Sequence, residues 1–290
     1  MNPAIYQQIL TSVLYLLTKI KLVTIIAPLE KYYVEGLTLG KIRPNRIKHK
    51  LERGEVATVV GGELTADMIE MLGPFGFDGV WVESEHGPID FGDARELTRA
   101  ADLWDLTSVA RVNLNLPGVI YRMLDQGAQG IVVPHVNTAE EARAVVDASK
   151  FHPLGQRGFY LGRQAIGVED YPKVANDETL VVVLIEDIVA INNLAEILEV
   201  DNIDVFMVAP GDLAQTMGYP GQPAHPEVKA VVDQAFEQII KRGRVTGTVA
   251  LEDDVEDLVA KGVQLLMAHY RSWMASGAQR YLDVVNQAVK

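Results

Sequence analysis

The sequence contains no cysteine among its 290 residues. This absence excludes disulfides, thiolate metal sites and thiol nucleophiles, and it gives no sign of an oxidising compartment, so we expect a cytoplasmic protein. Two phosphate-binding patterns are also missing: no G-x-G-x-x-G follows the first predicted strand, and G-x-x-x-x-G-K-[ST] does not occur. With a formal charge of -13 and no basic stripe, the chain is not expected to bind nucleic acid.

No uninterrupted apolar run is long enough to span a membrane. The most apolar stretch, IYQQILTSVLYLLTKIKLVTIIAPL, is interrupted by Lys19 and Lys21, whereas a span needs about 20 apolar residues. The first fifty residues carry eight Lys or Arg against two Glu, a net charge of about +6 in an otherwise acidic chain. We interpret residues 1–42 as a separate apolar and basic extension, either an amphipathic helix docked on protein or a poorly structured segment. Membrane contact is the less favoured alternative.

From about Pro44 onward, short β-branched runs alternate with longer segments of helical periodicity. The eight runs are VATVV (56–60), GVWVE (79–83), TSVARV (107–112), GIVVP (130–134), LVVVLIE (180–186), DVFMVAP (204–210), VTGTVA (245–250) and QLLMAH (264–269). Their almost continuous apolar character is typical of parallel strands covered on both faces. Eight strand and helix units predict a closed (β/α)8 barrel over residues 43–290. An open doubly wound sheet is the alternative, disfavoured by the missing glycine pattern.

Polar residues stand where several of these strands end, which is the face of such barrels that carries active sites. They are Glu83, Glu85 and His86 after the second run, Arg111 in the third, His135 after the fourth, Glu186 at the end of the fifth and Asp212 after the sixth. Polar groups in such apolar surroundings cost several kcal/mol when they are left unpaired. We therefore expect them to converge around a ligand or a metal.

Each of these residues also has an ordinary structural interpretation. Glu186 could face water and Asp212 could cap a helix, but together they offer two hard oxygen ligands, the usual pattern for Mg²⁺ or Mn²⁺. Arg111 could only balance nearby carboxylates, or its planar fork could bind a carboxylate or enolate oxygen. His86 could be a loop histidine, or a general base that titrates near neutral pH. We expect His135 and His269 to line the pocket without reacting.

The segment between the fourth and fifth strands, HPLGQRGFYLGRQAIG, is rich in glycine and contains Arg157 and Arg163. It is either a mobile lid that selects a substrate or a plain surface loop.

Several collinear motifs resemble the HpcH/HpaI aldolases. The motifs are GFDGVWVESEHGPID, ARVN, LDQGAQGIVVPHVNTAEEAR, HPLGQRGF, LIEDIVAINNLAEIL and APGDLAQTMGYPGQPAHPEV, in order from about Arg46 to the C-terminus. These aldolases are metal-dependent class II enzymes that add pyruvate to aldehydes or cleave the products. The resemblance implies reversible cleavage of 4-hydroxy-2-oxo acids to an aldehyde and pyruvate, or a related 2-oxo acid such as hydroxypyruvate, through an enolate.

By this resemblance His86 is the base, and Asp125, in YRMLDQGAQG, raises its basicity. Arg111 stabilises the charge of the enolate. Glu186 and Asp212 hold a divalent cation, which could be Mg²⁺, Mn²⁺ or Co²⁺, and the backbone N–H groups of Gly211 and Asp212 receive the substrate carboxylate.

The resemblance also implies a homo-oligomer, a hexamer, assembled through exchanged C-terminal helices such as WMASGAQRYLDVVNQAVK. Two positions depart from the family pattern: Glu83 replaces a frequent Asp, and Leu184 replaces a Gln that contacts substrate. The alternatives are a citrate-lyase-like or malyl-CoA-lyase-like enolate lyase, and a non-catalytic barrel tethered to a membrane. A Schiff-base aldolase is disfavoured because DVFMVAP contains no lysine.

Overall fold

The computed structural model describes residues 40–289. The predicted extension, residues 1–42, lies almost wholly outside the described residues, so its interpretation and the boundary at residue 43 stay predictions. The described part begins beside a distant loop, because the backbone N–H of Gly40 donates to the carbonyl of Gly167 at 2.7 Å.

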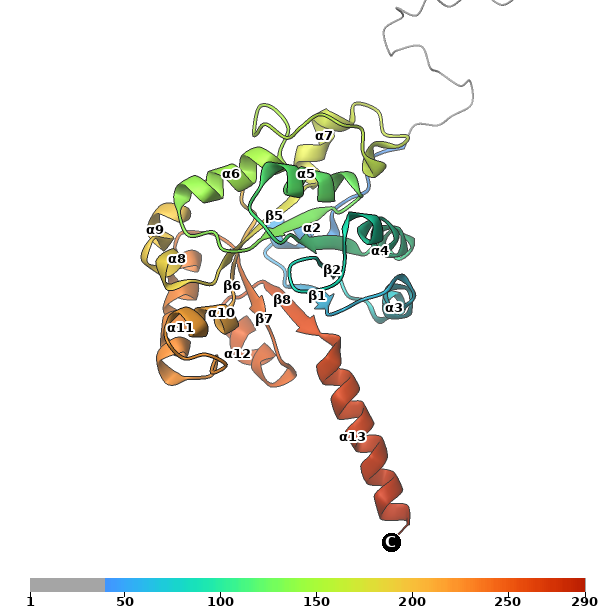
Figure 1. The fold of residues 1–290 in the computed structure, drawn as a ribbon, viewed down its shortest axis with the longest axis vertical. Coiled ribbons are helices and arrows are strands. Elements are labelled where there is room, and N and C mark those ends of the chain that lie inside the picture. The colour runs from blue at the N-terminus through green and yellow to red at the C-terminus, as the bar shows by residue number, and fades with distance from the viewer. Residues whose placement is uncertain (1–39, 290) are drawn as a thin grey trace, which may run out of the picture. The chain divides into compact units, whose positions relative to one another are not determined.

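Eight parallel strands close into a barrel in chain order, which confirms the predicted fold (Figure 1). The strands are β1 (Ala57–Gly61), β2 (Gly79–Glu83), β3 (Thr107–Arg111), β4 (Gly130–Val133), β5 (Leu180–Ile185), β6 (Val205–Val208), β7 (Thr246–Val249) and β8 (Leu265–His269). Each strand lies within or overlaps one of the eight β-branched runs. Continuous apolar runs identify these strands because helices and the barrel interior cover both faces of each strand.

Helices precede, connect and follow the strands of the barrel. They are α2 (Arg46–Glu52), α3 (Ala66–Leu72), α4 (Phe91–Leu103), α5 (Pro117–Asp125), α6 (Ala139–Ser149), α7 (Tyr171–Glu178), α8 (Ile188–Asn192), α9 (Leu194–Ile197), α10 (Pro210–Thr216), α11 (Pro226–Lys241), α12 (Val255–Ala260) and α13 (Tyr270–Ala288). Helices α3 to α12 connect successive strands around the barrel, whereas α2 precedes β1 and α13 follows β8. The start of α6 shows how sequence sets their bounds. The Thr138 hydroxyl accepts the backbone N–H of Glu141, and the Glu141 carboxylate accepts that of Thr138, which forms a capping box.

Alternation along the strands divides the core into two parts. One part fills the barrel and contains Val59, Trp81, Val109, Val132, Val182, Leu184, Met207 and Met267. Their neighbours in sequence point outward and pack under the helices. Two residues of α2, Ile47 and Leu51, join the inner part and close the N-terminal end of the barrel. The same alternation points every second residue near the C-terminal end of each strand into the barrel interior.

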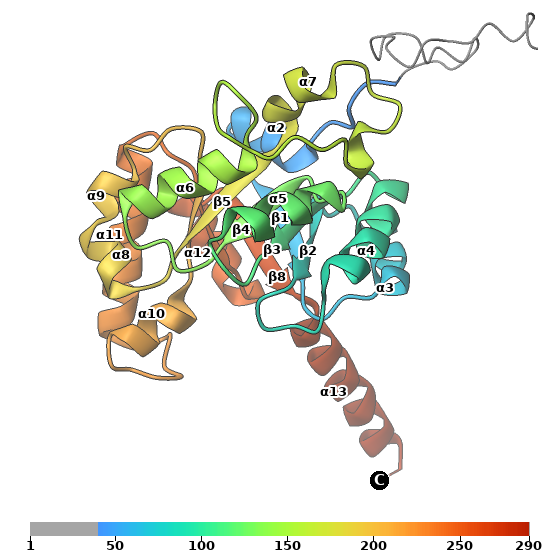
Figure 2. The ribbon, with the colours of Figure 1, turned by 45° about the horizontal axis from the view of Figure 1, so that its top comes forward.

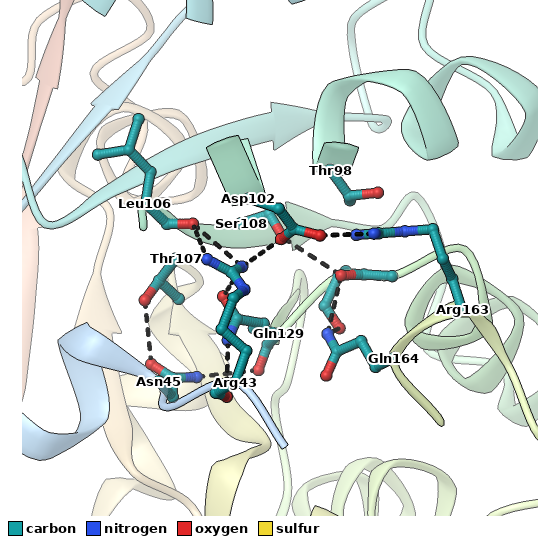
Figure 3. Close-up of polar contacts among 12 residues, drawn as sticks. Arg43, Asn45, Thr98, Asp102, Leu106, Thr107, Ser108, Gln129, Arg163 and Gln164 are labelled. Atoms are coloured by element: carbon teal, nitrogen blue, oxygen red, sulfur yellow. Dashed lines mark hydrogen bonds and ion pairs between the residues drawn. The ribbon is translucent and has the colours of Figure 1, made fainter. Parts of the chain in front are cut away.

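The N-terminal face of the barrel is fixed by a polar network around Asp102, at the end of α4 (Figure 3). The Asp102 carboxylate forms ion pairs with Arg43, which precedes α2, and with Arg163, at 2.5 Å for the latter. Gln164 donates to the carbonyl of Gly127, just before β4, at 2.8 Å. The segment after α6 is therefore anchored at the N-terminal end of the barrel, away from the C-terminal ends of the strands. Its interpretation as a lid over the C-terminal ends is wrong.

Helix α13 follows β8 directly and extends away from the barrel (Figures 1 and 2). None of its residues is buried, although Trp273 in its first turn stacks on Phe77 with 5.4 Å between ring centroids. Among residues 40–289, no helix combines the length and apolarity needed to cross a membrane.

Candidate active site

A cavity of about 290 Å³ opens at the C-terminal ends of the strands, close to the lower limit of typical small-molecule sites. It is lined by Gly62, Glu63, Trp81, Glu83, His86, Gly87, Arg111, Leu184, Met207, Ala209, Val249, Met267, His269 and Arg271. Its floor is apolar because it is the inner core of the barrel, whereas its rim carries charged and imidazole side chains. Among its walls are five residues named in the sequence analysis: Glu83, His86, Arg111, Leu184 and His269. His135, also expected to line the pocket, is not among them.

The Glu83 carboxylate organises one side of this cavity. Alternation along β2 places Glu83 on the inner face with Trp81, and its Oε2 accepts the indole N–H of Trp81 at 3.0 Å. Its Oε1 accepts the backbone N–H groups of Glu85 at 2.8 Å and of His86 at 3.0 Å. Burial raises the pKa of Glu83, but hydrogen bonds from Arg111 and from the His86 backbone outweigh it, so the pKa lies below its ordinary value of 4.5.

Arg111 is held between two carboxylates. It lies directly opposite Glu83 in the register of β2 and β3. Its Nε and Nη2 approach Oε2 of Glu83 at 2.8 and 2.7 Å, and its Nη1 lies 2.9 Å from Oε2 of Glu85. The side chain is only 16% exposed. A guanidinium has five N–H donors. Nε forms a hydrogen bond with Glu83, whereas the Nη1 and Nη2 contacts are ion pairs, so N–H donors remain for a ligand.

Glu85 connects the two polar sides of the barrel end. Besides Arg111, it approaches His135, with 3.5 Å between Oε1 and Nε2. Burial raises the pKa of Glu85, and the nearby cation of Arg111 only partly offsets this effect. Nε2 of His86 lies 3.8 Å from Oε2 of Glu85, and the His86 side chain is 68% exposed. His86 is therefore open to a ligand, as a proton-transfer group must be.

A second cluster of polar residues follows β4, β5 and β6. The Glu186 carboxylate is 1% exposed and accepts the backbone N–H of His135 at 2.7 Å, while the Nδ1 atom of that histidine lies 3.3 Å away. Burial raises the pKa of Glu186, and the negative charges of Asp212 and Glu85 raise it further. Carboxylates that repel one another in a buried place are stabilised by a cation.

The donors of this cluster fit a hard divalent ion, although they do not form a complete cage. Residues 40–289 contain no group of three His, Cys, Asp or Glu side chains arranged to hold a metal. The predicted pair, Glu186 and Asp212, would leave the remaining positions to substrate and water. The backbone N–H groups of Gly211 and Asp212, in the first turn of α10, have no intrahelical acceptor and stay open to an anion. Glu186, Gly211 and Asp212 do not line the cavity described above.

Asp125 lies apart from these groups. It is the last residue of α5, which runs from the C-terminal face back to the N-terminal face. Its carboxylate pairs with the buried guanidinium of Arg157 at 2.8 Å. Within the described residues no hydrogen bond or ion pair joins Asp125 to His86, so its predicted effect on that histidine has no contact in this chain to support it.

Glu83, Glu85 and His135 were expected at strand ends, but none of them was assigned a chemical role in the site. The sign that could have identified Glu83 is the period of two along β2, which puts it beside Trp81 on the inner face. His135 was expected to be a passive wall residue, but it lies between two carboxylates. Its backbone is left-handed, with φ of 53°, and nothing in the sequence around it indicates that turn.

Comparisons with known proteins agree on one family. The family model described as HpcH/HpaI aldolase/citrate lyase matches residues 62–269. The chain is 37% identical over 193 residues to a hydroxypyruvate/pyruvate aldolase of Sagittula stellata, covering 66% of this chain and 76% of the relative. It is 34% identical to a 2-keto-3-deoxy-L-rhamnonate aldolase of Klebsiella pneumoniae, covering 74% and 82%.

A solved structure gives the same result. The crystal structure of an HpcH/HpaI aldolase/citrate lyase family protein from Burkholderia cenocepacia has a TM-score of 0.79 and 25% sequence identity, and the match covers 83% of this chain and 99% of the other.

Replacing Glu83 with Gln tests the bracing of Arg111. A glutamine amide has a single acceptor oxygen, whereas each oxygen of Glu83 accepts from two donors, so two donors lose their acceptor. We therefore expect the free energy of unfolding at pH 7 to fall by about 1–3 kcal/mol. Because the folded pKa of Glu83 lies below the unfolded value, its contribution exists above that value and is lost as the pH falls through the folded pKa. The difference between variant and wild type should therefore shrink in acid, as measured by urea unfolding.

The exposed Glu237 on α11 provides the control, since Glu237→Gln changes charge equally and should stay within about 0.5 kcal/mol of wild type. Equal stability of the Glu83 variant and wild type at pH 7 would show that Glu83 does not brace the site.

Proposed function

The chain belongs to the HpcH/HpaI aldolase/citrate lyase family, and from this premise we propose that it is a metal-dependent aldolase. It reversibly cleaves 4-hydroxy-2-oxo acids to an aldehyde and pyruvate, or a related 2-oxo acid such as hydroxypyruvate. The named aldolase relatives support enzymatic activity of this class. The observation that carries the proposal is the immobilised Arg111 beside an open His86 at the rim of the cavity.

The position of Arg111 suits a negative charge that grows during reaction. Glu83 and Glu85 hold the guanidinium, which lines the cavity, so its position is set before a ligand arrives. Such preorganised donors stabilise a developing oxyanion without reorganising at the moment of reaction. A divalent cation held by Glu186 and Asp212 would supply a Lewis acid for the ketone and carboxylate oxygens of the 2-oxo acid.

His86 moves the proton. In the condensation direction it takes a methyl proton from pyruvate while Arg111 offsets the charge that accumulates on the ketone oxygen. The carbon nucleophile then forms a bond to the aldehyde carbon, and His86 returns the proton to the alkoxide oxygen. Cleavage follows the same steps in reverse. The exposure of His86 lets both partners reach its ring.

Proton exchange at the pyruvate methyl group, followed by NMR in D₂O, tests this half-reaction without knowledge of the aldehyde. We expect the full chain with Mn²⁺ or Mg²⁺ to catalyse exchange, and His86→Ala to lower the rate about 10²- to 10⁴-fold, the usual contribution of a general base. His152→Ala, on the exposed loop at the opposite face, is the matched control and should exchange at the wild-type rate.

A chelator should abolish exchange, and Glu186→Gln or Asp212→Asn should raise the metal concentration that restores half of the rate. Proton exchange that survives the chelator would refute the proposed metal dependence. A His86→Ala rate equal to wild type would refute the assigned base.

We further propose that the chain forms a homo-oligomer through α13. The helix exposes Met274, Tyr281, Leu282 and Val284, an apolar surface without partners among residues 40–289. A second copy is the occupant that closed symmetry supplies most simply. Analytical ultracentrifugation should show an oligomer that Leu282→Glu weakens, whereas Glu237→Gln leaves it intact. Sedimentation of the wild-type chain as a monomer at micromolar concentration would contradict this proposal.

A further inference from the structure

The cavity has a second polar side that the proposed mechanism does not use. Glu63 follows β1, His269 ends β8, and Arg271 lies in the first turn of α13. The two strands are adjacent, with Gly61 opposite His269 in register. These three side chains therefore line the cavity on a different wall from Glu83 and Arg111.

The ion pair between Glu63 and Arg271 is solvent-exposed, unlike the ion pair between Glu83 and Arg111. Nη2 of Arg271 lies 2.6 Å from Oε2 of Glu63, and the two side chains are 56% and 57% exposed. Exposed ion pairs contribute only about 0–1 kcal/mol, so this pair can rearrange around a ligand at little cost. Arg111, by contrast, is only 16% exposed and is held by both Glu83 and Glu85.

His269 offers a defined hydrogen-bond donor. Its Nδ1 accepts the backbone N–H of Arg271 at 3.4 Å, as the cap of α13. Burial and the nearby charge of Arg271 lower the pKa of His269, which favours the neutral ring at pH 7. A neutral imidazole that accepts at Nδ1 carries its proton on Nε2.

The imidazole ring of His269 packs closely against Gly62. Gly62 has a φ of +129°, and a Cβ there would lie 2.9 Å from Cε1 of His269 and 2.3 Å from the ring of Tyr270. The two rings stack with 5.6 Å between centroids. Only a residue without a side chain permits this approach.

The floor of the cavity cannot satisfy polar groups of a substrate. Leu184, Met207 and Met267 form it, and their side chains offer no strong donor or acceptor. A substrate hydroxyl that is not paired at the rim would be desolvated without compensation, which is unfavourable. The rim must therefore bind whatever polar groups the substrate presents beyond the reacting carbons.

We propose that Glu63, His269 and Arg271 form the subsite for the acceptor aldehyde and select aldehydes that carry a hydroxyl group next to the carbonyl. Glu63 accepts from this hydroxyl, and His269 or Arg271 donates to its oxygen. The inference rests on the proposed aldolase function and adds the residues that decide its acceptor specificity.

Two aldehydes of nearly equal size test the subsite. Glycolaldehyde carries the hydroxyl, and propionaldehyde has a methyl group in its place. With pyruvate and Mn²⁺, wild type should favour glycolaldehyde in kcat/KM by at least about tenfold, which corresponds to one hydrogen bond of average or greater strength. In His269→Leu and Arg271→Met this ratio should fall toward one, while methyl proton exchange of pyruvate stays at the wild-type rate.

The matched control is Arg53→Met. Arg53 forms an ion pair with Glu55 at the same distance, 2.6 Å, and with similar exposure, but near the end of α2 at the opposite face. It should leave the ratio unchanged. Glu63→Gln, which alters one charge and keeps the size, provides a second variant if the others fail to fold, and it should lower the ratio too.

A wild-type ratio near one, or an unchanged ratio in folded variants that still exchange protons, would overturn the subsite and leave the aldolase proposal intact. Absence of exchange in wild type would instead overturn the aldolase proposal, and the subsite with it.

Discussion

The arrangement of the whole active face depends on one buried carboxylate, that of Glu83. A charge removed from water is costly unless it is paired and fully hydrogen-bonded. Glu83 meets this condition by accepting from the Trp81 indole, from Arg111 and from two backbone N–H groups of the turn that carries His86. The same contacts that stabilise the carboxylate therefore fix the position of a cation and of the segment that holds an open imidazole.

Much of this arrangement was predictable from local patterns. The eight apolar runs give a closed parallel barrel, and the rule that strand ends carry the chemistry brings His86, Arg111 and Glu186 to one face. Alternation explains why Trp81 and Glu83 of β2 both point into the barrel, as does Leu184 of β5. These features follow from periods of two and 3.6 residues, which a sequence displays directly.

Other features depend on tertiary contacts that no local pattern encodes. Asp125 pairs with Arg157 because a loop 32 residues away folds back under the barrel. The segment after α6 is glycine-rich, like many lids, but ion pairing of Arg163 with Asp102 attaches it to the opposite end. The left-handed turn at His135, which places its ring between Glu85 and Glu186, is likewise set by its surroundings. Composition alone could not decide any of these.

The central claim is that Glu83 acts on the chemistry by holding Arg111. A double-mutant cycle of Glu83→Gln and Arg111→Lys, scored on the rate of pyruvate methyl exchange, measures this coupling directly. If Glu83 works through Arg111, the double variant should be hardly slower than Arg111→Lys alone, with an interaction energy of about 1–3 kcal/mol. Rate losses that simply add would contradict the account.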